Sequence, residues 1–166
     1  MKTIKIFGVL LALVVCTLAV NAQTKSYNKY GVSMAYPSYL VIEEEDYSNG
    51  ELTLSLASED EMSGMYLIVS DDEEISEMIQ LMGLETVFKL MQSEVLTGLG
   101  YFAQVGEVKA TATRATMPFT INDDGLLLQG EMTMDMSDKF VVTIVLGIGE
   151  KNFDDLKKAC STLKVE

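Results

Sequence analysis

Alternating apolar and polar positions recur along the chain and predict β-strands. A period of two places successive side chains on opposite faces of a strand. Residues 51–57 show it most clearly, because Leu52, Leu54 and Leu56 alternate with polar residues. The same reasoning predicts further strands at residues 30–36, 65–70, 111–121, 126–136, 140–148 and 162–166.

A period near 3.6 predicts two helical pieces in the middle of the chain. Ser70 and Glu73 have the spacing of a capping box, so a helix is expected to begin after Ser70. The apolar stripe that follows is out of phase with the next one, which predicts a break at Gly83. The two stripes are Ile75, Met78, Ile79 and Met82, then Leu84, Val87, Phe88, Met91 and Val95, with Gly98 and Gly100 ending the second.

A shorter final helix is expected to begin at the cap Asn152 and to carry Phe153, Leu156 and Cys160 on one side. Cys160 falls on the apolar side of this helix, and we expect it to be buried. Together the strands and helices predict an α+β domain, built on an antiparallel sheet of about six strands flanked by helices.

Three methionines at alternate positions form the first candidate site. Met132, Met134 and Met136 could be thioether ligands for Cu(I), or one face of a strand. The strand at 140–148 carries apolar residues at the matching positions, provided that residues 137–139 form a three-residue loop. The pattern therefore favours a methionine-rich core face, with the alternate polar face left to water.

A second candidate is a calcium loop over residues 120–131. Asn122, Asp124, Gly125 and Glu131 stand at EF-hand positions, but Thr120 stands where the first aspartate is needed. Both flanks read as strands, whereas an EF-hand joins two helices. A tight hairpin turn explains the stretch without an ion.

The N-terminus predicts export. Lys2 and Lys5 precede an apolar run, and the small residues before Gln23 suit cleavage after Ala22. Residues 1–22 are therefore expected to be a signal peptide, and residues 23–166 one domain in the periplasm or outside the cell, with no membrane span after cleavage. Val15 is too bulky for a lipoprotein motif ending at Cys16, so that cysteine is expected to leave with the signal.

Charge and composition exclude several kinds of function. The chain has 25 acidic and 12 basic residues, and a net charge of −13 repels nucleic acid and anionic headgroups. Its acids gather at residues 43–46, 59–61 and 71–74, where solvated loops and helix starts are expected. The absence of histidine removes the usual general base and most zinc sites. After cleavage Cys160 is the one cysteine left, so an intramolecular disulfide cannot form.

Both ends of the mature chain resemble Mog1/PsbP-like domains. The stretch YGVSMAYPSYL at residues 30–40 is similar to the opening of that family, with Tyr39 where tryptophan is typical. Residues 139–165 are similar to its closing strand, helix and strand. The resemblance implies an α/β/α sandwich and a binding or assembly role, with no catalytic, cofactor-binding or metal-ligating residues to carry over.

The leading hypothesis is therefore a non-enzymatic, exported binding or interaction module of the bacterial cell envelope. Its partner is expected to be a protein or a small apolar ligand, and no cofactor is expected. Two alternatives stay open: a small envelope hydrolase that uses carboxylates only, and a protein that handles Cu(I) or Ca²⁺.

Overall fold

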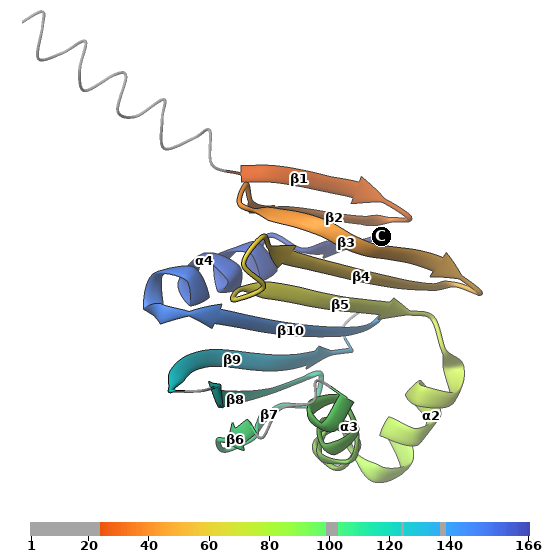
Figure 1. Ribbon diagram of the computed structural model, residues 1–166. Coiled ribbons are helices and arrows are strands. Elements are labelled where there is room, and N and C mark those ends of the chain that lie inside the picture. Colours follow the sequence, from red (N-terminus) through yellow and green to blue (C-terminus); the bar gives the residue numbers. More distant parts are fainter. Residues whose placement is uncertain (1–23, 99–102, 124, 137–138) are drawn as a thin grey trace, which may run out of the picture.

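The computed structural model describes residues 24–98, 103–123, 125–136 and 139–166 (Figure 1). Within these ranges the chain is a sheet-rich α+β fold whose strand pairs are all antiparallel, as predicted. The predicted signal peptide, its cleavage site and Cys16 lie outside the described residues. So do Gly100 and residues 137–138 of the predicted hairpin loop.

The main sheet has eight strands, so the prediction of about six was too low. Their order is β3-β4-β5-β10-β9-β8-β6, with β7 also paired to β8. Their bounds are β3 Leu40–Ser48, β4 Glu51–Ser58, β5 Gly64–Ser70, β6 Ala103–Val105, β7 Lys109–Ala110, β8 Arg114–Asp123, β9 Leu126–Asp135 and β10 Phe140–Ile148.

A second, three-stranded sheet is built from the two ends of the described chain. Strands β1 (Thr24–Lys29) and β2 (Val32–Pro37) form a hairpin, and β11 (Lys164–Val165) pairs with the other edge of β2. This sheet contacts the edge of the main one, because Lys29 forms an ion pair with Glu45 at 2.8 Å and Tyr30 stacks on Tyr47. With a φ of 54°, Tyr30 lies in the turn between β1 and β2, rather than in the strand predicted from residue 30.

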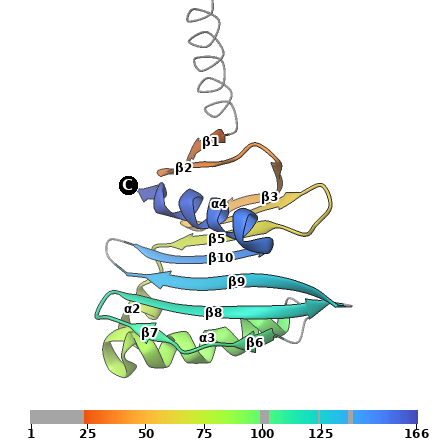
Figure 2. The same cartoon turned by 90° about the vertical axis from the view of Figure 1, so that its left-hand side faces the viewer.

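Two hydrophobic cores lie on opposite faces of the main sheet. Helix α4 (Gly149–Ser161) and the small sheet cover β4 and β5 on one face, and helix α3 (Leu84–Gly98) covers β8, β9 and β10 on the other. Figure 2 shows α4 lying across the sheet, with α3 near the other edge. Strand β10 contributes to both cores, which suits a central strand.

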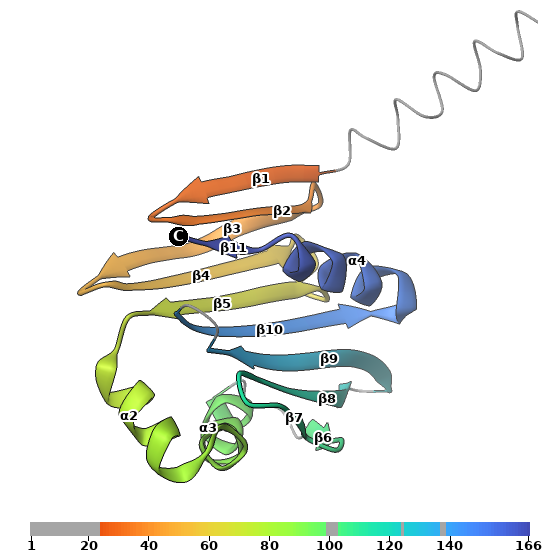
Figure 3. The same cartoon turned by 180° about the vertical axis from the view of Figure 1, so that it is seen from behind.

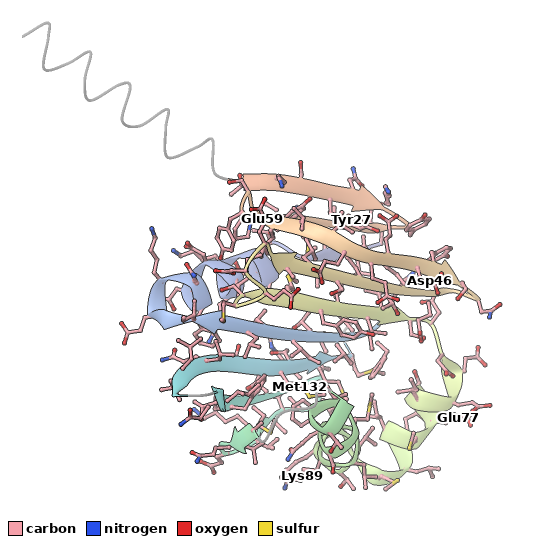
Figure 4. All side chains as sticks on the ribbon, in the orientation of Figure 1. Tyr27, Asp46, Glu59, Glu77, Lys89 and Met132 are labelled. Carbon is pink, nitrogen blue, oxygen red and sulfur yellow. The ribbon has the colours of Figure 1, made fainter. Side chains whose placement is uncertain are left out.

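The strand faces near the hairpin follow the predicted parity. Met132 lies opposite Ile144 and Met134 opposite Val142, and all four face the α3 core. Figure 4 shows Met132 on β9 pointing toward α3. The alternate residues do not face water as expected, because Thr133 and Thr143 are buried on the α4 side of the sheet.

The middle helices confirm the break but correct the cap. Helix α2 (Glu73–Met82) ends at Gly83, whose φ of 83° is reached easily without a Cβ. The N-cap is Asp72, whose carboxylate accepts a hydrogen bond from the Glu74 amide at 2.8 Å. Ser70 is the last residue of β5 instead, and its hydroxyl accepts from the Asp72 amide at 3.2 Å.

Burial differs between the two predicted apolar stripes. Leu84, Val87 and Phe88 of α3 are buried as expected. In α2 no residue is buried, and Met78 and Met82 are exposed, so this helix was wrongly predicted to turn its whole stripe inward. The physical reason is position, because α2 lies beyond the end of β5 and packs against α3 rather than across the sheet (Figure 1).

Helix α4 begins earlier than the predicted cap at Asn152. Strand β10 passes directly into the helix at Gly149, and the N-cap Ile148 has no side-chain capping bond. The end of β10 and the first turns of α4 lie very close together, because a Cβ on Gly147 would lie 2.9 Å from the Phe153 amide nitrogen. Asn152 is therefore inside the helix, where its amide nitrogen lies 3.5 Å from the Ser63 hydroxyl.

The acids at residues 43–46 lie in strand β3 rather than in a loop. This strand is the edge of the main sheet and carries a register shift between Ile42 and Glu44. Charged side chains and a bulge are common protections of an exposed edge against pairing with another chain. The clusters at 59–61 and 71–74 do lie at a strand connection and at a helix start, as predicted.

Candidate functional site

A cavity opens between the end of α4, strand β11 and the α4-side face of β8, β9 and β10, and we call it the α4–β11 pocket. Its volume is about 390 Å³, within the range of small-molecule sites. Figure 3 shows β11 following α4 and returning past the main sheet. The lining residues are Arg114, Thr133, Asp135, Lys139, Val141, Thr143, Cys160, Leu163, Lys164 and Val165.

The floor of the pocket is set by strand register. Thr133 lies directly opposite Thr143 in the pairing of β9 with β10. Asp135 lies opposite Val141 on one side and opposite Arg114 on the other. Antiparallel pairing thus places two hydroxyls, one carboxylate and one guanidinium on a single face.

The opposite wall comes from the C-terminal end of the described chain. Thr162 and Leu163 donate backbone hydrogen bonds to the Ala159 and Cys160 carbonyls, which close the last turn of α4. The chain then pairs with β2, where Lys164 lies opposite Ser33. This return places Leu163, Lys164 and Val165 over the sheet, with the two apolar side chains packed against the α4-side core.

Three cationic side chains converge on the pocket from three different elements. Arg114 begins β8, Lys139 precedes β10, and Lys164 is in β11. They are three of the 12 basic residues in a chain of net charge −13, so the local field here opposes that of the whole molecule.

Part of this positive charge is already compensated. Arg114 lies 3.9 Å from the Asp135 carboxylate, and Lys139 lies 3.3 Å from the Asp71 carboxylate outside the pocket. Nearby Glu131 is engaged by Lys157 at 2.8 Å. Among the residues that the structure describes, Lys164 makes no ion pair. Lys164 is therefore the cation most readily available to an anionic ligand.

Cys160 contributes a neutral thiol to the pocket wall. It is half-buried rather than buried as predicted, because it borders this cavity. Burial raises the pKa of its thiol to about 11, against the opposing effect of a hydrogen bond with Thr143. At neutral pH the sulfur is protonated, and a thiol in that state is a poor nucleophile and a poor metal ligand.

The methionine candidate proves to be core. Met132 and Met134 have no solvent exposure, and Met136 is partly buried against the same cluster. The prediction of a methionine-rich core face is confirmed. Thioethers in this position are closed to a metal ion arriving from solvent.

The residues of the calcium candidate are engaged in other contacts. Asn122 lies in β8, and its side-chain oxygen accepts from the Gly125 amide at 3.0 Å, as in the predicted turn. Glu131 lies on β9 and pairs with Lys157, while Asp124 lies outside the described residues. In the described part of the chain, no three His, Cys, Asp or Glu side chains are grouped so as to hold a metal ion.

Another cavity, of about 390 Å³, is lined only by polar residues that include Glu51, Asp71 and Asp72. Two of the remaining cavities are less specific in their chemistry. One of about 450 Å³ is lined mostly by apolar side chains of β4, β5 and β10, with Glu61 as its charged residue. The other, of about 520 Å³, lies between the end of β2 and α4 and includes Tyr39, Lys151, Asp155 and Lys158. Neither draws like charges together from distant elements, as the α4–β11 pocket does.

Sequence reasoning missed every polar residue of this pocket. Thr133 and Asp135 were assigned to a water-facing side, and Lys164 to an ordinary last strand. One threonine within each of two apolar strands, Thr133 and Thr143, was the available signal, because a purely structural buried strand favours Val, Ile or Leu. The described helices, at residues 73–98 and 149–161, include none with the length and apolar character to cross a bilayer.

The chain matches no family model and no curated protein. Its similarity to Mog1/PsbP-like domains is thus a resemblance of residues 30–40 and 139–165, and what the structure shows of the fold is its α+β class.

Proposed function

We propose that the protein is an exported, non-enzymatic binding module of the cell envelope, and that its ligand is a small organic anion held in the α4–β11 pocket. Export rests on the predicted signal peptide at residues 1–22. A binding role also agrees with the resemblance to Mog1/PsbP-like domains, in which an α/β/α sandwich would frame the pocket.

One observation carries the proposal: Arg114, Lys139 and Lys164 surround a cavity in a strongly acidic protein. Cations brought together from β8, from the residue before β10 and from β11 repel one another, and an anion bound between them would relieve that repulsion. A carboxylate or phosphate group suits the pocket, because it accepts charge-assisted hydrogen bonds from lysine and arginine. Asp135 balances one of the three charges, and the lining formed by the described residues keeps a net positive charge.

The apolar part of the lining describes the rest of the ligand. Val141, Leu163 and Val165 form an apolar wall beside the cations. An aliphatic or aromatic body attached to the anionic group would bury its surface there, at roughly 25 cal/mol for each Å² removed from water. We therefore assign an amphipathic organic anion rather than a bare inorganic ion.

The groups present in the pocket favour binding over catalysis. A hydrolase that uses only carboxylates needs two acids facing its substrate, and among the described residues that line the pocket Asp135 is the one acid. Covalent catalysis by cysteine needs a thiolate, whereas the pKa of Cys160 is raised to about 11 by burial. The described lining can thus hold an anion, and it contains no matched acid–base pair among the residues that the structure describes.

Thermal unfolding with a series of straight-chain carboxylates tests this function. Acetate, butyrate, hexanoate and octanoate share one headgroup and lengthen the apolar body, while hexanol lacks the charge. At a concentration of about 100 Kd a ligand of the folded state adds about 2.7 kcal/mol to the free energy of unfolding. The melting temperature should rise with chain length for the acids and stay unchanged with hexanol.

Lys164→Gln and Lys89→Gln make a matched pair of variants. Both remove one positive charge, but Lys89 lies on α3, far from the pocket, in an exposed pair with Glu85 (Figure 4). Lys164→Gln should abolish the stabilisation by hexanoate, and Lys89→Gln should retain it. Equal stabilisation of both variants, or no shift of the unaltered protein with any acid, would overturn the proposed function.

A further inference from the structure

Helix α2 presents an apolar surface that the fold leaves uncovered. Met78 and Met82 are exposed, and Leu81 is 87% exposed, which is far more than a leucine placed for packing would be. These three side chains are called the α2 ridge. A cluster of large apolar side chains on a protein surface commonly marks an interaction site.

The two sides of α2 have separate tasks. Ile75 and Ile79 are partly buried and pack against the α3-side core. The α2 ridge follows the adjacent side of the helix, one turn apart at Met78 and Met82 with Leu81 beside them. Anchoring is completed after the Gly83 break by Leu84, which is buried. The ridge is therefore not needed to attach the helix to the domain.

Acidic residues border the α2 ridge along its length. Glu74 lies one turn before Met78, and Glu77 lies one turn before Leu81. Glu77 projects outward from α2 (Figure 4). Within the described ranges, neither glutamate forms an ion pair, and the last turn of α2 has no basic residue. Asp72 adds negative charge at the start of the helix, whereas Asp71 is paired with Lys139.

This combination selects one class of partner by charge. An apolar ridge flanked by uncompensated carboxylates attracts an apolar surface flanked by lysine or arginine. A second copy of the chain would bring Glu74 and Glu77 against the same glutamates, and an anionic membrane would repel them, so both are disfavoured. Thioether side chains also adapt their shape to an aliphatic surface at low cost.

We propose that α2 is a docking site for a cationic amphipathic helix of a partner protein. The aliphatic face of the partner lies on Met78, Leu81 and Met82, and its lysines or arginines pair with Glu74 and Glu77. Two amphipathic helices would thus pack against each other, with apolar side chains at helical spacing supplying affinity and flanking charges fixing orientation. The site is separate from the α4–β11 pocket and does not depend on the ligand proposed there.

The test uses a synthetic, fluorescently labelled amphipathic helix of leucine and lysine as the probe. Fluorescence anisotropy measures its binding to the full chain at low salt and at about 0.15 M salt. A peptide of the same composition with its leucines and lysines scrambled has the same charge without an apolar face. The ordered peptide should bind at least tenfold more tightly than the scrambled one at the higher salt concentration.

Four variants place the binding on α2. Leu81→Ser should raise the Kd about tenfold, because burying a leucine is worth about 1.5 kcal/mol or more. Its control, Leu127→Ser, removes another exposed leucine, on β9, and should leave the Kd unchanged. Glu77→Gln should weaken binding several-fold, unlike Glu59→Gln, which removes an exposed glutamate elsewhere (Figure 4). Because both substituted side chains of α2 are exposed, folding is retained.

Several outcomes would overturn this inference. Equal weakening by Glu77→Gln and Glu59→Gln would show a general attraction between an acidic protein and a basic peptide. Equal binding of ordered and scrambled peptides would show the same. Self-association of the chain that Leu81→Ser abolishes, or binding to vesicles of anionic lipid, would assign the ridge to a different partner.

Discussion

Gly130 is the position where one methyl group should have the largest effect on stability. It lies directly opposite Phe119 in the pairing of β8 with β9, and the aromatic ring lies over the glycine. A Cβ at residue 130 would lie 2.7 Å from Cε1 of Phe119 and closer still to Cζ and Cε2. Phe119 is itself 2% exposed in the α3-side core, so the ring has little room to move.

Gly130→Ala should therefore destabilise the protein. Where no such clash occurs, replacing glycine by alanine stabilises a protein by roughly 0.4–1 kcal/mol, because it lowers the conformational entropy of the unfolded chain. Forcing a methyl group into a packed core costs about 1–3 kcal/mol. For a domain of this size each kcal/mol corresponds to a shift of about 3 °C in melting temperature. The expected decrease is about 3–9 °C, measured by calorimetry and by urea denaturation.

A double-mutant cycle with Phe119→Leu isolates the contact. The single Phe119→Leu change loses buried ring surface and should also destabilise. Once the ring is gone, alanine at residue 130 meets open space, so the double variant should be more stable than the sum of the two losses by about 1 kcal/mol or more. Losses that add within about 0.5 kcal/mol, or a stabilising Gly130→Ala, would refute this reasoning.

Three further predictions concern buried groups. Burial raises the pKa of Cys160 to about 11 and that of Tyr27 to about 12, so the unfolded chain loses these protons first and the free energy of unfolding should fall as pH rises above about 9. In urea denaturation, the free energy of unfolding of Cys160→Ser should fall less between about pH 9 and 11 than that of the unaltered protein. The difference should be about 1–2 kcal/mol after allowance for the partial exposure of Cys160. The buried Tyr27 hydroxyl has no hydrogen-bond partner among the described residues. Tyr27→Phe should therefore leave the free energy of unfolding unchanged, or raise it by about 1 kcal/mol, in the same urea assay. A large decrease in the free energy of unfolding would contradict this. Met132→Leu should cost less than about 1.5 kcal/mol and Met132→Ala about 2–5 kcal/mol, with no effect of Cu(I) on the unaltered melting temperature; a metal-dependent rise would oppose the core assignment.

Local patterns in the sequence were sufficient for the centre of the fold. The alternation in β4, β9 and β10 identified one buried apolar face of each strand, since parity is a property of the strand itself. The phase change at Gly83 also located the break between two helices. Strand β3 was missed because its acids suggested a loop, although Asn49-Gly50, with φ values of 52° and 82°, is a strong signal for a hairpin that requires a strand on each side.

The sequence of one helix shows which of its sides is apolar, but it does not show whether another element covers that side. Coverage depends on where the helix lies in the tertiary structure. The stripes of α2 and α3 look alike in sequence, yet only α3 lies against the sheet. The α4–β11 pocket depends on the same kind of information. Arg114 and Lys164 meet at one cavity because β11 pairs with β2, a contact between the two ends of the described chain that no local pattern predicts.

The two faces of strand β10 differ in polarity where the strand borders the pocket. Strand β10 turns Phe140, Val142 and Ile144 toward α3, where methionines fill the core without polar groups. Its other face carries Thr143 between Val141 and Val145, in a place where valine would fill the same volume. Retaining a hydroxyl in a buried strand lowers stability unless the hydroxyl is hydrogen-bonded, and here Thr143 contacts the Cys160 thiol beside a cavity edged with cations. Beside the pocket, the α4-side face of β10 therefore carries a polar group that packing alone does not require.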